Sequence, residues 1–120
     1  MHWYLVYTIC WHEKKVMERL KRKGFETFLP TVERPSQKNP QERITVPLFP
    51  SYLLIRTEMN ASTYLNVLKT AGVVGFFRNN GRPVIIADEQ VNYIKDGKHL
   101  NISPDLEENI TFSVLNPHQL

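Results

Sequence analysis

VPLFPSYLLIR, at residues 46–56, is the stretch on which the expected fold depends, because two prolines stand directly before a long apolar run. Proline has no amide hydrogen to donate to a sheet, so we expect the sheet either to bend at Pro47 and Pro50 or to present an edge there. Residues 51–57 follow the prolines and are rich in branched and aromatic side chains, a composition typical of strands. The sequence therefore predicts a strand that begins just after the prolines.

Side chains alternate along a strand, and this strand carries apolar residues on both of its faces. One face holds Tyr52, Leu54 and Arg56, and the opposite face holds Ser51, Leu53 and Ile55. The first strand alternates in the same way, with Trp3, Leu5 and Tyr7 opposite Tyr4, Val6 and Thr8. Either both faces are buried within the protein, or the second face forms an apolar patch edged by tyrosine hydroxyls, which suits an interface.

The remaining chain alternates between strand and helix patterns. Strands are predicted over 3–8, 25–34, 43–46, 51–57, 73–78 and 84–86, and helices over 12–23, from Asn60 or Ser62 to Lys69, and from a cap at Asp88. The polar loop over 35–41 predicts a long antiparallel hairpin, and Asn79-Asn80-Gly81 predicts a turn. This order predicts an α+β domain with a mainly antiparallel sheet and helices packed against one face.

Helical spacing identifies the side chains that we expect to face the core. They are Val16, Met17 and Leu20 in the first helix, Leu65 and Leu68 in the second, and Val91 and Ile94 in the third. Beyond residue 96 the apolar periodicity fades, and residues 110–115 are expected to form either a last short strand or a linker.

The composition is that of one small domain. The chain has 120 residues, a net charge of +3 and a single cysteine, Cys10, so no internal disulfide can form. No basic stretch precedes the apolar start, and no apolar run approaches the roughly 20 residues of a membrane span. We expect a monomer in a reducing cytoplasm, with no membrane contact.

The sequence shows no constellation for catalysis. The four histidines have no metal-ligand spacing, the five glycines form no phosphate loop, and Cys10 has only His12 nearby as a base. We therefore expect no enzyme activity, no metal and no cofactor.

Several motifs occur together in a recognisable order: Trp3-Tyr4-Leu5-Val6-Tyr7, Glu13-Lys14-Lys15-Val16, Gly24-Phe25-Glu26, Phe28-Leu29-Pro30, Pro47-Leu48-Phe49-Pro50-Ser51-Tyr52, Gly72-Val73-Val74-Gly75-Phe76, Arg82-Pro83 and Ala87-Asp88-Glu89. In this order and spacing the chain resembles the N-terminal domain of the NusG family of transcription elongation factors. Leu48 and the Glu-Lys-Lys helix look more like the specialised antiterminators RfaH and UpxY than like housekeeping NusG. The resemblance implies an N-terminal domain over 1–100 and, over 101–120, a linker toward a KOW domain that the chain lacks.

The resemblance also implies partners. In the family, this domain docks through an apolar depression onto the β′ clamp helices of RNA polymerase, and the matching positions here are Tyr7, Phe49, Tyr52 and Leu54. A second contact, to the β subunit, matches Ser62, Thr63 and Tyr64. Bridging the cleft in this way would suppress pausing or termination. A ribosomal protein or a termination factor would bind only through the missing KOW domain.

The first helix is rich in cations, with Lys14, Lys15, Arg19, Lys21, Arg22 and Lys23 set against Glu13 and Glu18. We expect Trp11, His12, Lys14, Lys15 and Arg19 to contact the non-template DNA strand of a transcription bubble, through phosphates and base stacking. The alternatives are an ordinary solvated helix face and a packing role for Trp11. The competing hypothesis for the whole chain is an RNA-binding module of RRM-like architecture. Its only support is Gly75-Phe76-Phe77, which partly matches the glycine- and phenylalanine-rich motif of such modules.

Overall fold

The computed structural model describes residues 1–96, and its centre is a five-stranded antiparallel sheet. The strand order is β2-β5-β1-β6, and β9 also pairs with β1. These strands are β1 (His2–Thr8), β2 (Glu26–Phe28), β5 (Tyr52–Thr57), β6 (Val73–Phe76) and β9 (Ile85–Ile86). The predicted α+β class with a mainly antiparallel sheet is confirmed, and β5 begins just after the two prolines as expected.

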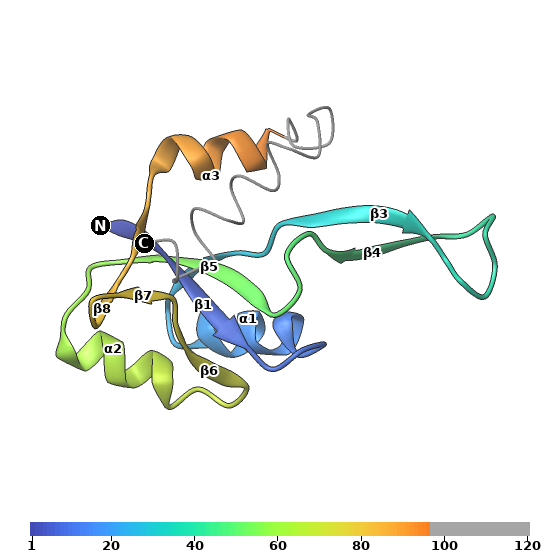
Figure 1. Ribbon diagram of the computed structural model, residues 1–120. Helices are drawn as coiled ribbons and strands as arrows, with labels where there is room; N and C mark the ends of the chain where they lie inside the picture. The colour runs from blue at the N-terminus through green and yellow to red at the C-terminus, as the bar shows by residue number, and fades with distance from the viewer. Residues whose placement is uncertain (97–120) are drawn as a thin grey trace.

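The helices cover both faces of the sheet, as Figure 1 shows. Helices α1 (Glu13–Arg22) and α2 (Ala61–Leu68) lie on one side, and α3 (Asp88–Lys95) lies on the other. The prediction that all helices pack on one face is therefore wrong for α3. The physical reason is the double apolar character of β1 and β5, since each of their faces has to be removed from water.

Two separate cores result from this arrangement. On the α1 and α2 side, the buried residues are Tyr4, Val6, Val16, Leu20, Leu53, Ile55, Val67 and Phe76. On the α3 side, they are Trp3, Leu5, Leu54, Phe77, Ile86 and Val91. The alternation predicted for the first strand and for residues 51–57 is thus confirmed on both faces.

The helices largely follow their predicted bounds. Val16 and Leu20 are fully buried, as the helical spacing predicts. In α2 the prediction for Leu65 is wrong: this side chain is 52% exposed, whereas Val67 is buried. Helix α2 packs against the core through Tyr64, Val67 and Leu68, and this packing leaves Leu65 on the outer face.

Helix α3 begins one residue away from the predicted cap. Asp88 is its first helical residue, and the N-cap position is held by Ala87. The Gln90 side chain accepts a hydrogen bond from the Ala87 amide at 3.3 Å, which supplies the capping contact in place of an aspartate.

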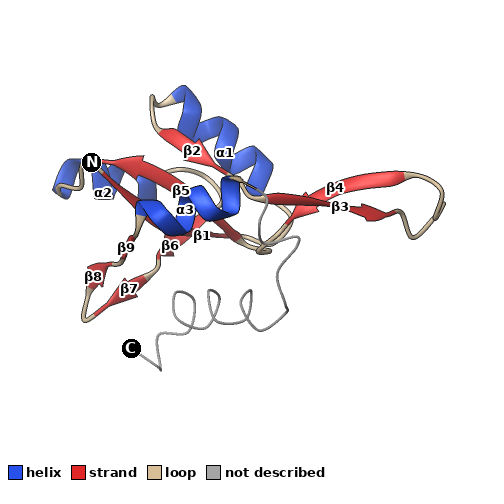
Figure 2. Ribbon diagram, turned by 90° about the horizontal axis from the view of Figure 1, so that it is seen from above, coloured by secondary structure: helices blue, strands red, loops and turns tan. Residues whose placement is uncertain are grey.

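A long hairpin projects from the body of the domain (Figures 1 and 2). It is formed by β3 (Thr31–Pro35) and β4 (Arg43–Pro47), joined by the predicted polar loop. The strand predicted over 25–34 is divided at residues 29–30, so that its first part pairs with β5 and its second with β4. The Leu48 amide donates a hydrogen bond to the Pro30 carbonyl at 2.8 Å, which closes the base of the hairpin.

A second, smaller hairpin consists of β7 (Arg78–Asn79) and β8 (Arg82–Pro83), around the predicted turn at Asn79-Asn80-Gly81. Within residues 1–96, no helix is long and apolar enough to cross a membrane. The predicted linker over 101–120 and the alternatives for 110–115 lie outside the described residues.

Candidate functional site: an aromatic pocket at one end of the sheet

Tyr7 and Tyr52 form an aromatic pair at the end of β1 and the start of β5. They are direct partners in the β1–β5 register, and their ring centroids lie 4.9 Å apart at an interplanar angle of 45°. Tyr7 is 40% exposed, whereas Leu5 and Leu54, the next pair on the same face, are buried. Burial under α3 therefore decreases toward this end of the sheet, where Tyr52 is half-buried and Tyr7 is exposed.

The turn before β5 fixes the position of Tyr52. Ser51 has a positive φ of 73°, and the Tyr52 amide donates a hydrogen bond to the Phe49 carbonyl at 3.2 Å. The Thr8 amide donates to the Ser51 carbonyl at 2.7 Å, which ties this turn to the end of β1. The proline-containing stretch thus places Tyr52 beside Tyr7.

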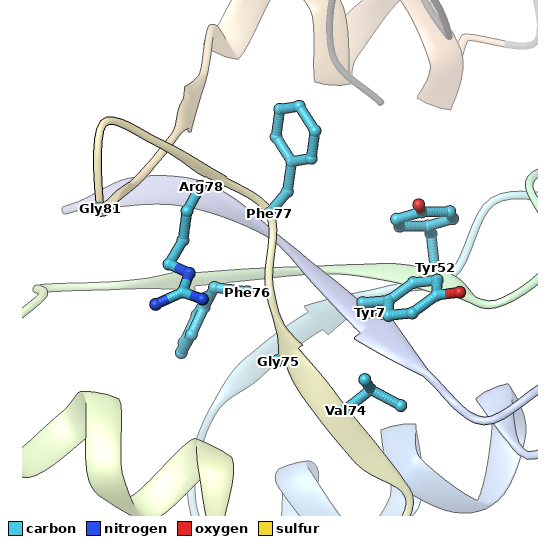
Figure 3. Close-up of a pocket in the computed structure, with 8 residues that line it drawn as sticks. All are labelled: Tyr7, Tyr52, Val74, Gly75, Phe76, Phe77, Arg78 and Gly81. Carbon is cyan, nitrogen blue, oxygen red and sulfur yellow. The ribbon is translucent and has the colours of Figure 1, made fainter. Parts of the chain in front are cut away.

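A pocket of about 520 Å³ opens beside the tyrosine pair, and Figure 3 shows its lining. Its residues are Tyr7, Tyr52, Val74, Gly75, Phe76, Phe77, Arg78 and Gly81. Gly75 lies directly opposite Tyr7 in the β1–β6 register, and a Cβ built on it would meet no atom within 4 Å. The absence of a side chain at Gly75 therefore leaves open the space next to the Tyr7 ring.

Sequence reasoning found Tyr7 and Tyr52 but missed the wall formed by β6 and the residues after it. A signal was present, since a glycine inside an apolar strand often marks a place where a ligand or another chain approaches closely. The 56% exposure of Val74, its neighbour, could not be read from the sequence.

The phenol of Tyr52 is shifted toward its neutral form. Burial raises the pKa of Tyr52 above its ordinary value, and the neighbouring Tyr7 phenol raises it further. The pocket thus offers an apolar surface edged by a neutral hydroxyl that can donate and accept hydrogen bonds.

The other two predicted docking residues lie differently. Phe49 is half-buried in the turn before β5 and does not line the pocket. Leu54 is 3% exposed and packs in the core under α3 with Trp3. Leu54 therefore supports the surface from beneath and does not form part of it.

The predicted β-subunit residues lie at the start of α2. Ser62 is exposed, and the Thr63 amide donates a hydrogen bond to Asn60 Oδ1 at 2.8 Å. Tyr64 stacks on Phe76 with centroids 5.2 Å apart, and its hydroxyl accepts a hydrogen bond from Arg78 at 3.4 Å. Since Phe76 and Arg78 also line the pocket, Tyr64 links α2 to the pocket wall.

The predicted DNA residues lie around the turn before α1 and along that helix. Trp11 is 82% exposed, so the structure does not support the packing alternative for it. Lys14 and Lys15 are exposed, and His12 is half-buried at the helix start. Arg19 is engaged within the domain, because its guanidinium donates to the Ala71 carbonyl at 2.8 Å.

Two assumptions about the charges of this helix need correction. Glu13, taken as a counter-charge on the solvated face, is only 2% exposed. The Lys23 ammonium donates to the Asn66 carbonyl at 3.0 Å and to the Thr70 hydroxyl at 2.9 Å, so it is held by α2 and the turn after it. The cations of this helix that stay exposed, with no hydrogen bond or salt bridge among residues 1–96, are thus Lys14, Lys15, Lys21 and Arg22.

Comparison with known proteins agrees with this geometry. The family described as "Transcription termination factor nusG" matches residues 1–95. The chain belongs to the NusG family. The NusG transcription termination/antitermination protein of Pseudomonas aeruginosa is 34% identical over 77% of this chain and 58% of its own length. The corresponding protein of Chlamydia trachomatis is 30% identical over 88% of this chain and 59% of its own.

A solved structure of Thermotoga maritima NusG superposes with a TM-score of 0.60 at 28% identity, over 78% of this chain and 54% of the other. The chain therefore spans less than two thirds of the length of the NusG proteins that it matches. These relatives carry the NusG name, so they give no support to the specialised RfaH or UpxY type.

The RRM-like hypothesis finds no exposed aromatic platform at Gly75-Phe76-Phe77. Phe76 is 6% exposed and Phe77 is 7% exposed, and they belong to the cores on opposite faces of the sheet. Stacking on RNA bases needs exposed rings on one face, so this part of the NusG domain is not suited to it. Within the described residues, no group of histidine, cysteine or acidic side chains could hold a metal ion.

Proposed function

We propose that this chain is the polymerase-binding domain of a transcription elongation or antitermination factor, and that it docks on the β′ clamp helices of RNA polymerase through the surface around Tyr7 and Tyr52. The observation that carries the proposal is the pair of an exposed Tyr7 and a half-buried Tyr52, beside the pocket that Gly75 leaves open. The names of the relatives, which are transcription termination/antitermination proteins, support the same process.

The surface has the properties of an interface centre. Tyrosine combines a large, rigid apolar ring with a polar tip, and such residues dominate binding energies when they enter a desolvated contact. An apolar side chain from a polymerase helix would fill the pocket between Tyr7 and Val74. The Tyr52 hydroxyl would then hydrogen-bond to polar atoms at the edge of that contact.

A second contact to the polymerase β subunit would come from Ser62, Thr63 and Tyr64. Ser62 is the exposed member of this set, and Tyr64 holds the start of α2 against Phe76. A domain that binds both sides of the cleft favours the closed polymerase, because a ligand shifts an equilibrium toward the state that it binds better. Suppression of pausing or termination follows from this preference and needs no chemistry by the domain.

The third proposed contact is the non-template DNA strand, through Trp11, His12, Lys14, Lys15 and Arg19. Exposed lysines suit phosphates, and the exposed Trp11 ring suits an unpaired base. We place this activity in the bacterial cytoplasm, with the domain acting as a monomer. The specialised antiterminator type stays a hypothesis, and it predicts loading at particular operons through a DNA element.

The deciding experiment is binding of the chain to an isolated β′ clamp-helix fragment. The wild type is expected to bind with about micromolar affinity or better, and Tyr52→Ala to weaken binding at least about tenfold. Gly75→Leu is expected to do the same by filling the pocket, because its Cβ has open space and the fold has room for it.

The matched control is Ile85→Ala, which removes an apolar side chain that is 52% exposed and does not line the pocket. It should bind like the wild type. Unchanged binding by folded Tyr52→Ala and Gly75→Leu would refute this docking surface, and no binding by the folded wild type would refute docking at the clamp helices.

A further inference from the structure

One charged side chain lies among the residues that line the Tyr7–Tyr52 pocket. Seven of the eight lining residues are aromatic, aliphatic or glycine, and the eighth is Arg78. Figure 3 shows the Arg78 side chain on one side of β6 and the two tyrosine rings on the other, with Gly75 between them. Because Gly75 has no side chain, a partner that contacts the tyrosines can pass over β6 and reach the arginine. None of the contacts proposed above uses Arg78.

The positive charge of Arg78 is not neutralised among residues 1–96. The side chain is exposed and takes part in no salt bridge there. The β7–β8 hairpin to which it belongs carries a second arginine, Arg82, and no acid. A guanidinium that a partner covers loses its water, so the partner has to supply a negative charge or a hydrogen-bond acceptor in return.

Helix α2 holds the guanidinium in place. Its Nη1 atom donates a hydrogen bond to the Tyr64 hydroxyl at 3.4 Å. The Tyr64 ring stacks on Phe76 with 5.2 Å between centroids and 15° between ring planes, and Phe76 packs edge-on against the buried Tyr4 at 6.3 Å. This column of rings fixes the hydroxyl. Within the described part of the chain the guanidinium makes no other hydrogen bond, so its remaining N–H donors can serve a partner.

The surroundings of Arg78 favour a protein partner over a nucleic acid. A nucleic acid backbone is usually held by several cations, whereas Arg78 is the only charged side chain in the pocket lining. The apolar part of the lining, which includes Val74 and Phe77, gains from an apolar side chain and not from a phosphate. A helix with an apolar side chain and an acid three or four residues apart on one face fits both parts.

We propose that Arg78 is a specificity-determining residue of the docking surface: it pairs with an acidic side chain of the partner helix, and Tyr64 positions it for this pair. A carboxylate matches the planar guanidinium and can accept two hydrogen bonds from it. The inference rests on the proposed docking at the clamp helices and deepens it, since it states a charge that the partner helix must carry. It also gives Tyr64 a part in this docking surface, separate from the proposed contact with the β subunit.

The test is binding of the full chain to the isolated β′ clamp-helix fragment at about 0.1 M and about 0.5 M salt. Arg78→Glu should weaken binding at least about tenfold at the lower salt concentration, because the pair becomes a repulsion. Arg78→Gln should weaken binding about three- to tenfold and make it less dependent on salt. Arg82→Glu is the matched control: it makes the same change of charge on the same hairpin, outside the pocket lining, and should alter the affinity less than about twofold.

Variants of the fragment identify the acid. Each aspartate and glutamate of the fragment is changed in turn to lysine, and one of these variants should bind Arg78→Glu more tightly than it binds the wild type. Tyr64→Phe should weaken binding of the unchanged fragment about twofold to threefold. It should have no further effect in Arg78→Gln, because the hydroxyl acts only through the guanidinium. A purely structural role of Tyr64 would instead lower the affinity equally in both backgrounds.

Unchanged binding by folded Arg78→Glu would overturn the pairing, and so would equal losses in Arg78→Glu and Arg82→Glu. The same holds if no lysine variant of the fragment prefers Arg78→Glu. If Arg78→Gln binds the fragment like the wild type but binds a bubble template more weakly, the arginine faces nucleic acid and the choice of partner is wrong. Binding that depends on Tyr52 but not on Arg78 refutes this inference alone, whereas no binding by the folded wild type refutes the docking proposal as well.

Discussion

The Tyr7 ring lies across from the Tyr52 ring, with 4.9 Å between their centroids, one pair beyond the buried Leu5 and Leu54. An aromatic pair contributes about 0.5–1.5 kcal/mol beyond the area that it buries. We therefore expect a double-mutant cycle of Tyr7→Ala, Tyr52→Ala and the double variant to give a coupling free energy in this range. The free energy of unfolding of each variant would be measured by urea denaturation. If Tyr52→Ala lowers the free energy of unfolding by more than about 4 kcal/mol, Tyr52 is a core residue, which would argue against the docking proposal.

Gly72 cannot be replaced without cost. Its φ is 92°, and a Cβ at this position would lie 2.6 Å from the Val16 side chain, which is fully buried. Gly72→Ala should lower the free energy of unfolding by roughly 2–4 kcal/mol, through backbone strain and overpacking together. Gly24→Ala separates the two effects, because Gly24 has the same φ and open space around it. If both variants lower the free energy of unfolding equally, the close contact with Val16 does not contribute to the loss.

Charge reversal at Lys14 and Lys15 should weaken the DNA contact and leave polymerase docking unchanged. Both lysines are exposed and lie outside the Tyr7–Tyr52 pocket, so their charge affects mainly an anionic partner. A footprint on a bubble template would measure the first effect, and clamp-helix binding would measure the second. An unchanged footprint would mean that this helix face is an ordinary solvated surface without a DNA contact.

Arg19 is predicted to behave differently from the two lysines. Arg19→Ala removes the hydrogen bond to the Ala71 carbonyl, which holds the turn before β6 against α1. It should lower the free energy of unfolding by about 1 kcal/mol in chemical denaturation, while Lys15→Ala should have little effect on stability. If Arg19→Ala is as stable as Lys15→Ala, the contact with Ala71 does not contribute measurably.

The free energy of unfolding at alkaline pH should depend on Tyr52. Its pKa is raised above the ordinary 10.0 by burial and then by Tyr7, so the unfolded chain loses this proton first. The stability that this phenol contributes is complete below pH 10.0 and is lost as the pH rises through the higher pKa of the folded state. Denaturation at increasing pH should show a steeper alkaline loss for the wild type than for Tyr52→Phe. If the wild type and Tyr52→Phe lose stability equally as the pH rises, the pKa of Tyr52 is the same in the folded and unfolded states.

The sequence by itself determined the order of strands and helices, the alternation along β1 and β5, and the hairpin after residue 30. These features depend on local chemistry: periodicity, proline positions and turn residues act over a few neighbouring residues. The pairing of Tyr7 with Tyr52 depends in addition on the register between β1 and β5, which the sequence did not specify.

Only the tertiary structure decided which apolar face stays open. Leu54 and Tyr52 lie on the same face of β5, yet Leu54 is buried in the core under α3, whereas Tyr52 is only half-buried and its partner Tyr7 is exposed. Likewise, Glu13 looks in the sequence like any acid of a charged helix although it is buried, and Gly75 opens a pocket because it lies opposite Tyr7. Burial depends on segments far apart in the chain, and one sequence does not specify their distances.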